Sequence, residues 1–122
     1  MNYIDLLKEF EVKEPLPDAL IEANSAPFFD LDEDISLVIP SYMAWCLKHD
    51  HSDGNLVIDG TISALSEIGR VKNTEHSYYK FKSGCSEKQT GLIIEFLEWT
   101  LLFDILNHEQ IERAIKQWRK TS

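Results

Sequence analysis

Apolar residues recur at helical spacing from the start of the chain. Tyr3, Leu6, Leu7 and Phe10 follow an i, i+3, i+4, i+7 pattern, and Asn2 before them suits a helix N-cap. This first helix is expected to end before Glu14-Pro15. A second, shorter helix follows, with Pro17 in its first turn and Ala26-Pro27 closing it.

The last third of the chain carries the strongest helical pattern. Ser86 and Gln89 match a capping box, and the apolar positions behind them cover much more than one stripe. This pattern predicts a central helix from Ser86 to about Phe103. Asn107 is placed to cap a final amphipathic helix, which a short connection should fold back antiparallel to the central one.

The middle of the chain is less regular. Residues 35–39 are β-branched and apolar and precede Pro40, which favours a short strand or an extended segment, with Ser41 then capping a helix. Tyr42, Trp45, Cys46 and His49 would face inward on that helix. A further helix would end at a Gly69 C-terminal cap, and residues 77–82 are expected to form a strand or a packed loop.

Together these patterns predict a mainly α protein, an irregular helical bundle around the C-terminal helix, with one or two short β strands left open. The chain has 122 residues and 43% apolar residues, so we expect residues 1–122 to form a single compact domain. The start of the chain lacks a signal-peptide pattern, and Cys46 and Cys85 form no CxxC pair. A cytoplasmic location is therefore predicted.

Charge is distributed unevenly along the chain. Residues 1–60 contain three Lys/Arg against 13 Asp/Glu, whereas residues 61–122 contain nine against eight. Such asymmetry favours a basic protein partner and would repel nucleic acid and anionic lipid, so neither nucleic acid nor a membrane is expected as a partner. The acidic run with its aromatic lead-in is the expected contact surface, together with two acidic residues further on: Phe28, Phe29, Asp30, Asp32, Glu33, Asp34, Asp50 and Asp53.

Motifs for catalysis or metal binding are weak. His49, Asp50, His51 and Asp53 lie in one polar segment, but their spacing fits neither a calcium loop nor a closed zinc site, so we predict no metal and no cofactor. Cys85, beside a helix N-cap, is the one thiol whose surroundings would lower its pKa, yet no base can be placed near it. No catalytic residue is predicted, and the chain is not expected to be an enzyme.

Basic and aromatic residues are mixed in the segment between two predicted helices of the second half. This cluster is typical of single-strand nucleic-acid surfaces, although the overall negative charge favours local pairing with the acidic half instead. Its members are Arg70, Lys72, His76, Tyr78, Tyr79, Lys80 and Lys82.

Two resemblances bear on function. The order of the Phe28-Phe29 segment, Ile39-Pro40-Ser41-Tyr42, Tyr79-Lys80-Phe81 and Ser86-x-x-Gln89 resembles a family of small uncharacterised bacterial proteins, over about residues 28–103. Those motifs imply a shared helical fold and no particular reaction. In size, acidity and lack of catalytic motifs, the chain also resembles the immunity proteins of polymorphic toxin and contact-dependent growth inhibition systems.

The resulting hypothesis is an immunity, antitoxin-like protein that binds and occludes a basic cognate toxin, such as a nuclease domain. A non-catalytic adaptor or regulatory binding module is the first alternative. The second alternative is a small metal-dependent hydrolase that uses the segment from His49 to Asp53.

Overall fold

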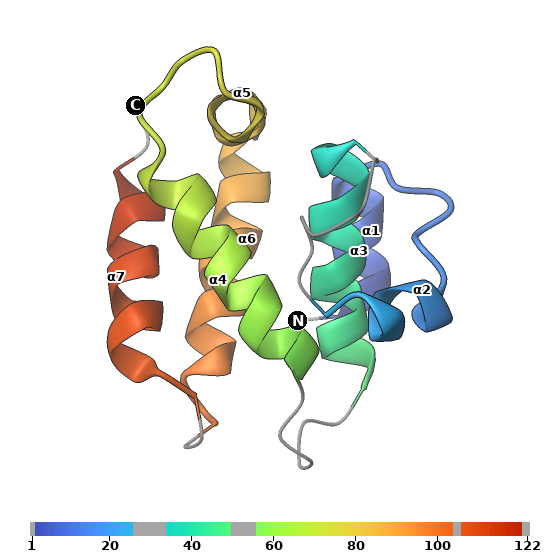
Figure 1. Cartoon of the computed structure of the whole chain (residues 1–122). Helices are drawn as coiled ribbons and strands as arrows, with labels where there is room; N and C mark the ends of the chain where they lie inside the picture. The colour runs from blue at the N-terminus through green and yellow to red at the C-terminus, as the bar shows by residue number, and fades with distance from the viewer. Residues whose placement is uncertain (1, 26–33, 50–55, 104–105, 121–122) are drawn as a thin grey trace. The chain divides into compact units, whose positions relative to one another are not determined.

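The computed structural model describes residues 2–25, 34–49, 56–103 and 106–120. These residues contain seven helices and no strand (Figure 1), which confirms the prediction of a mainly α fold. The helices are α1 (Tyr3–Glu9), α2 (Asp18–Ala23), α3 (Ile35–Lys48), α4 (Leu56–Arg70), α5 (Ser77–Gly84), α6 (Glu87–Thr100) and α7 (His108–Arg119).

The chain divides into two compact units, Met1–Ala64 and Leu65–Ser122, with the boundary inside α4. We refer to them as unit 1 and unit 2 and describe each by itself. The expectation of one compact domain over residues 1–122 stays a prediction.

Unit 1 is organised around α3, which contacts both α1 and α2. Asn2 caps α1 as predicted, because its Oδ1 accepts a hydrogen bond from the Ile4 backbone N–H at 2.7 Å. The helix ends with Glu11 at a φ of 58°, while the Glu11 and Val12 N–H groups bond to the Lys8 and Leu7 carbonyls. This is a Schellman ending with glutamate in the left-handed position that glycine usually fills.

The predicted strand or extended segment at residues 35–39 is wrong, because these residues form the first part of α3. Asp34 caps the helix in place of Ser41, and Pro40 lies inside it. Nine consecutive buried residues, from Val38 to Cys46, stabilise the helix and outweigh the roughly 3 kcal/mol that an interior proline costs. Ser41 is buried in mid-helix, where its Oγ accepts a hydrogen bond from the Leu16 N–H at 3.1 Å.

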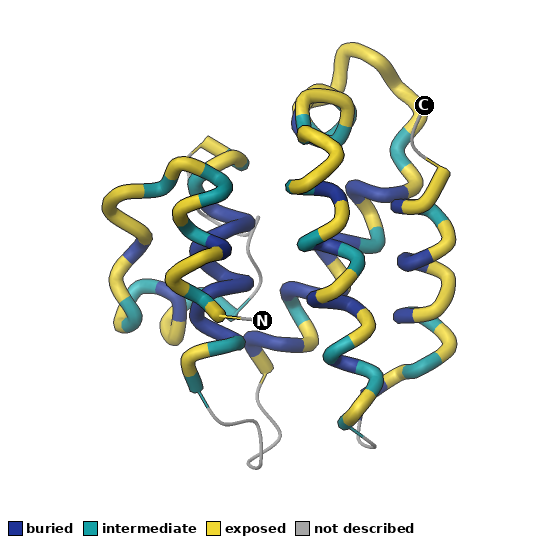
Figure 2. Tube along the Cα trace, turned by 180° about the vertical axis from the view of Figure 1, so that it is seen from behind, coloured by how far each residue is buried: buried dark blue, intermediate teal, exposed yellow. Residues whose placement is uncertain are grey.

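Unit 2 confirms the strongest sequence predictions. Ser86 and Gln89 form the complete capping box at the start of α6, and Asn107 Oδ1 accepts from the Gln110 N–H at the start of α7. The two helices contact each other and run antiparallel (Figure 1). Buried and exposed positions alternate along these helices (Figure 2), and the buried face of α7 ends in a fully buried Trp118.

Two local predictions in unit 2 are wrong. Residues 77–82 belong to α5, because the His76 side chain accepts a hydrogen bond from the Tyr78 N–H at 3.1 Å and caps a helix there. Gly69 does not end α4, which continues to Arg70. A Cβ atom at Gly69 would lie 3.0 Å from Trp118 Cδ1, so a side chain at this position would press on the buried indole.

Candidate functional site

Of the predicted contact residues, only Asp34 lies in the part of the chain that the structure describes. Its Oδ1 accepts hydrogen bonds from the Ser36 backbone N–H at 2.9 Å and from the Ser36 hydroxyl at 2.8 Å. These bonds lower the pKa of Asp34 below its usual value, so its exposed carboxylate stays charged. The other predicted contact residues lie outside the described part of the chain and stay predictions: Phe28, Phe29, Asp30, Asp32, Glu33, Asp50 and Asp53.

His49 is the one described member of the predicted metal segment, since Asp50, His51 and Asp53 lie outside the described residues. Its Nε2 lies 3.1 Å from Asp18 Oδ2, and its ring packs on Trp45 with 4.4 Å between ring centroids. Glu22 is also nearby, so that one ligand atom from each of Asp18, Glu22 and His49 lies within 4.8 Å of the others.

These three side chains already have protein partners that connect α2 to the end of α3. Lys48 Nζ donates to Asp18 Oδ2 at 3.0 Å, and Trp45 Nε1 donates to Glu22 Oε2 at 3.1 Å. Burial raises the pKa of Asp18, but the hydrogen bonds and charges of Lys48 and His49 outweigh it and leave the pKa below its usual value. Holding α2 against α3 is therefore enough to explain why these three side chains lie together, without a metal ion.

Both cysteines are free, and burial makes both weak acids. The Cys46 thiol is fully buried, lies 3.7 Å from Thr61 Oγ1, and has its pKa raised to about 12. Burial also raises the pKa of Cys85, to about 11, which contradicts the expectation that its position beside a helix N-cap would lower it. At neutral pH neither sulfur is a thiolate, the form that acts as a nucleophile.

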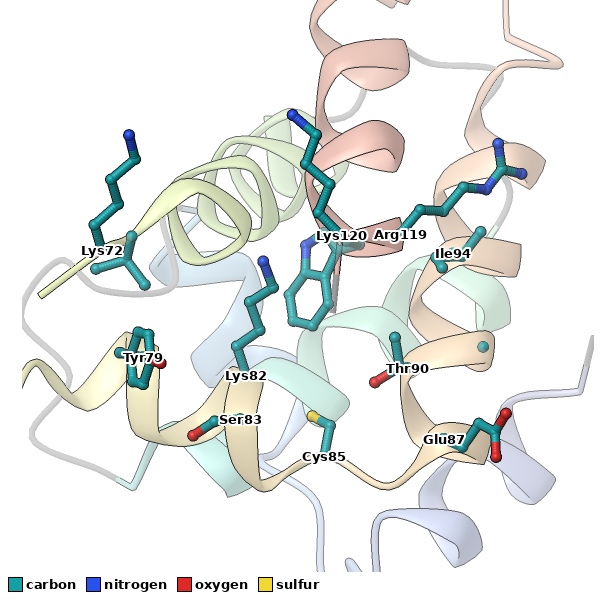
Figure 3. A pocket seen from close by; sticks show the side chains of 13 residues that line it. Lys72, Tyr79, Lys82, Ser83, Cys85, Glu87, Thr90, Ile94, Arg119 and Lys120 are labelled. Carbon is teal, nitrogen blue, oxygen red and sulfur yellow. The ribbon is translucent and has the colours of Figure 1, made fainter. Parts of the chain in front are cut away.

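Unit 2 contains a pocket of about 780 Å³ whose lining is mainly basic and apolar (Figure 3). We call it the basic pocket. It lies where the ends of α4 and α7 meet α5 and the first turns of α6. Its lining comprises Val71, Lys72, Tyr79, Lys82, Ser83, Cys85, Glu87, Thr90, Gly91, Ile94, Trp118, Arg119 and Lys120.

Lys82 connects the ends of two helices in the basic pocket. Its ammonium group donates to the Gly69 carbonyl at 2.6 Å and to the Gln117 carbonyl at 3.0 Å, near the C-terminal ends of α4 and α7. It also lies 5.6 Å from the centre of a Trp118 ring. Burial lowers the pKa of Lys82, while the two carbonyl oxygens and the negative ends of two helices favour its charged form.

The structure brings only part of the predicted basic and aromatic cluster into this pocket. Lys72, Tyr79 and Lys82 line it, whereas Arg70, His76, Tyr78 and Lys80 do not. Arg119 and Lys120 also line the pocket, although they do not belong to the predicted cluster. Their position 37 or more residues beyond Lys82 gave no local signal that they share its pocket.

The division into units coincides with the division of charge. Residues 61–64 carry no charge, so unit 1 holds three Lys/Arg against 13 Asp/Glu and unit 2 holds nine against eight. Several described carboxylates of unit 1 are exposed, among them those of Asp5, Glu11, Glu14 and Asp59. The net negative charge of the protein thus belongs to unit 1.

Comparison with protein-family models, curated proteins and solved structures finds no match to this chain. The two resemblances named above therefore stay predictions. Among the described residues, no helix has both the length and the apolar character needed to cross a membrane.

Proposed function

We propose that this protein is an immunity, antitoxin-like inhibitor whose acidic unit 1 binds a basic cognate toxin and covers its active site. The observation that supports the proposal is that the excess negative charge of the chain lies within one of its two compact units. Thirteen of the 21 acidic residues lie in unit 1, together with only three of the 12 basic residues. An acidic surface of this kind speeds association with a basic partner and disfavours anionic ones.

A nuclease domain is the partner class that fits this charge best. Nucleases must carry positive charge where they hold the phosphate backbone, so an acidic protein can occupy the same surface. Inhibition would follow from occlusion of the substrate, with no chemical step on the immunity protein.

Unit 1 also offers an exposed apolar side chain next to an acidic residue in the sequence. Ile4 is 59% exposed on α1 and adjoins the exposed Asp5. Apolar anchors surrounded by a polar rim dominate the affinity of protein interfaces. Ile4 therefore joins Phe28 and Phe29 as a proposed anchor, while the carboxylates would set the association rate.

The test is co-expression with the product of the gene immediately upstream, scored for a stable complex and for rescue of growth when that product is toxic. Both results together would support the immunity function. A complex without any toxicity would instead indicate the adaptor, and absence of both complex and rescue would reject the proposal.

Charge variants then locate the surface. The substitutions D30N, D32N, E33Q and D34N together remove four charges from unit 1, and asparagine at position 34 keeps the ability to cap α3. The matched control removes four exposed charges from unit 2 with E75Q, E95Q, E109Q and E112Q. We expect the first set to slow association about tenfold or more at low salt, and the control set to change it much less. Equal effects would show that net charge alone matters and would remove the acidic run from the interface.

A further inference from the structure

The basic pocket has the size and mixed character of a small-molecule site. Its volume of about 780 Å³ lies within the roughly 300–1,000 Å³ that is typical of such sites. The apolar part of its wall includes Val71, Tyr79 and Ile94. These residues are half-buried, so part of each side chain remains accessible to a ligand. Cations supply most of the polar lining.

The charge balance of the pocket indicates the charge of its ligand. Four cations line it, Lys72, Lys82, Arg119 and Lys120, against one carboxylate, Glu87. A second carboxylate, Glu98, neutralises part of this charge through its 3.3 Å ion pair with Arg119. Two positive charges therefore remain uncompensated by these neighbours, within a protein whose net charge is −9.

We propose that the basic pocket binds a small organic dianion of the phosphate-monoester type, with the phosphate among the lysines and the organic part against the apolar wall. The inference concerns unit 2 and is independent of the proposed function of unit 1.

Lys82 is the fixed part of this site. Two of its three ammonium N–H groups bond to the Gly69 and Gln117 carbonyls, and no described residue accepts the third. These neutral carbonyls orient the ammonium group without cancelling its charge. A cation that is already held in place loses little conformational entropy when an anion binds, which favours affinity.

Lys72 and Lys120 are the adjustable part. Both are exposed and follow the ends of α4 and α7, and their side chains extend in the same direction as that of Lys82 in Figure 3. Long, exposed lysines can move toward a bound phosphate at little structural cost. The Thr90 hydroxyl also lines the pocket and can donate a hydrogen bond to a phosphate oxygen. The Ser83 hydroxyl can do the same once it gives up its long, 3.4 Å hydrogen bond to the Lys80 carbonyl.

Phenyl phosphate is a suitable probe, because at pH 7.5 a phosphate monoester carries close to two negative charges. Its binding to the full chain is measured by calorimetry, with benzyl alcohol as the uncharged control. The pocket variant is K72Q/K120Q. The matched control is K80Q/K116Q, which removes two exposed lysines from α5 and α7 outside the pocket and changes the net charge equally.

We expect phenyl phosphate to bind the wild type and benzyl alcohol not to bind. Binding should weaken about tenfold in the pocket variant and less than twofold in the control, because only the first loses charge-assisted contacts. In spectra of labelled protein, the amide signals of Cys85, Thr90 and Gly91 should shift on addition of the probe.

Three results would overturn the proposal. The first is no binding of phenyl phosphate at millimolar concentration. The second is an equal loss of affinity in both double variants, which would show that net charge and not the pocket is responsible. The third is a set of shifted amides that excludes Cys85, Thr90 and Gly91, which would place the bound probe outside the pocket.

Discussion

Gly69 of α4 lies directly against the Trp118 indole of α7. A Cβ atom built on Gly69 would be 3.0 Å from both Cδ1 and Nε1 of that ring. The indole has little freedom to move, because it is fully buried and its Nε1 donates to the Leu65 carbonyl at 2.8 Å. Helix packing in unit 2 therefore leaves little room for a side chain at position 69.

The substitution G69A should destabilise the protein. Alanine favours the helix by about 1 kcal/mol over glycine, but overpacking a rigid neighbour costs about 1–3 kcal/mol, so the steric effect should prevail. Denaturant unfolding measures the difference. The matched control is G91A in α6, where a Cβ atom meets nothing within 4 Å, and it should stabilise by about 0.5–1 kcal/mol. A stabilised G69A variant would show that Trp118 can yield.

Ser41 should contribute to stability from the interior of α3. Its hydroxyl is the acceptor for the buried Leu16 N–H at 3.1 Å, so S41A would leave that N–H without a partner. An unsatisfied buried donor costs about 1–3 kcal/mol. The comparison variant S63A removes an exposed serine hydroxyl from α4 and should change the free energy of unfolding by less than about 0.5 kcal/mol. Equal effects of the two substitutions would remove this role from Ser41.

Ser41 and Gly69 also show which structural features can be predicted from the sequence and which cannot. The capping box at Ser86 and Gln89 was predicted correctly because both partners lie within one turn and their bonds depend on local backbone alone. Ser41 and Gly69 look locally like caps, yet each serves a partner 25 or more residues away: Leu16 for Ser41, and Trp118 for Gly69. Tertiary contacts of this kind leave no periodic pattern.

The difference between local and long-range contacts also explains which residues of the basic pocket could be predicted. Lys72, Tyr79 and Lys82 were grouped correctly because they are close in sequence, whereas Arg119 and Lys120 reach the pocket only through the packing of α7 in unit 2. The β-branched, apolar character of residues 35–39 favours a strand or an extended segment, but the Asp34 cap and extensive burial override this local preference.

Lys82 should stabilise unit 2 as well as shape its pocket. K82M keeps the length of the side chain but leaves the Gly69 and Gln117 carbonyls without their donor, which should cost about 1–3 kcal/mol. K80M, an exposed lysine two positions away on the same helix, is the control and should have little effect. Thermal unfolding monitored by circular dichroism makes the comparison. If both variants melt together, the two carbonyl bonds contribute nothing net.

Asp34 should make stability depend on pH at the start of α3. Its hydrogen bonds to Ser36 lower its folded-state pKa below the unfolded value of about 3.9. The unfolded chain therefore takes up the proton more readily, and the contribution of Asp34 is present above about pH 4 and is lost as the pH falls through the folded pKa. D34A should cost about 1 kcal/mol at pH 7, the usual value for a lost N-cap, and D34N much less. Unfolding at pH 7 and pH 3 tests this, and an undiminished cost of D34A at pH 3 would contradict it.

Cys85 should react slowly with thiol reagents although part of it is exposed. Its pKa of about 11 leaves on the order of one thiolate in 3,000 at pH 7.5, against about one in ten for an ordinary thiol of pKa near 8.5. Alkylation by iodoacetamide should therefore be about two orders of magnitude slower than that of free cysteine, and should rise steeply with pH up to about 11. C85S identifies the signal, because Cys46 is fully buried and should react only on unfolding. Rapid labelling of Cys85 at neutral pH would show that burial does not suppress its ionisation.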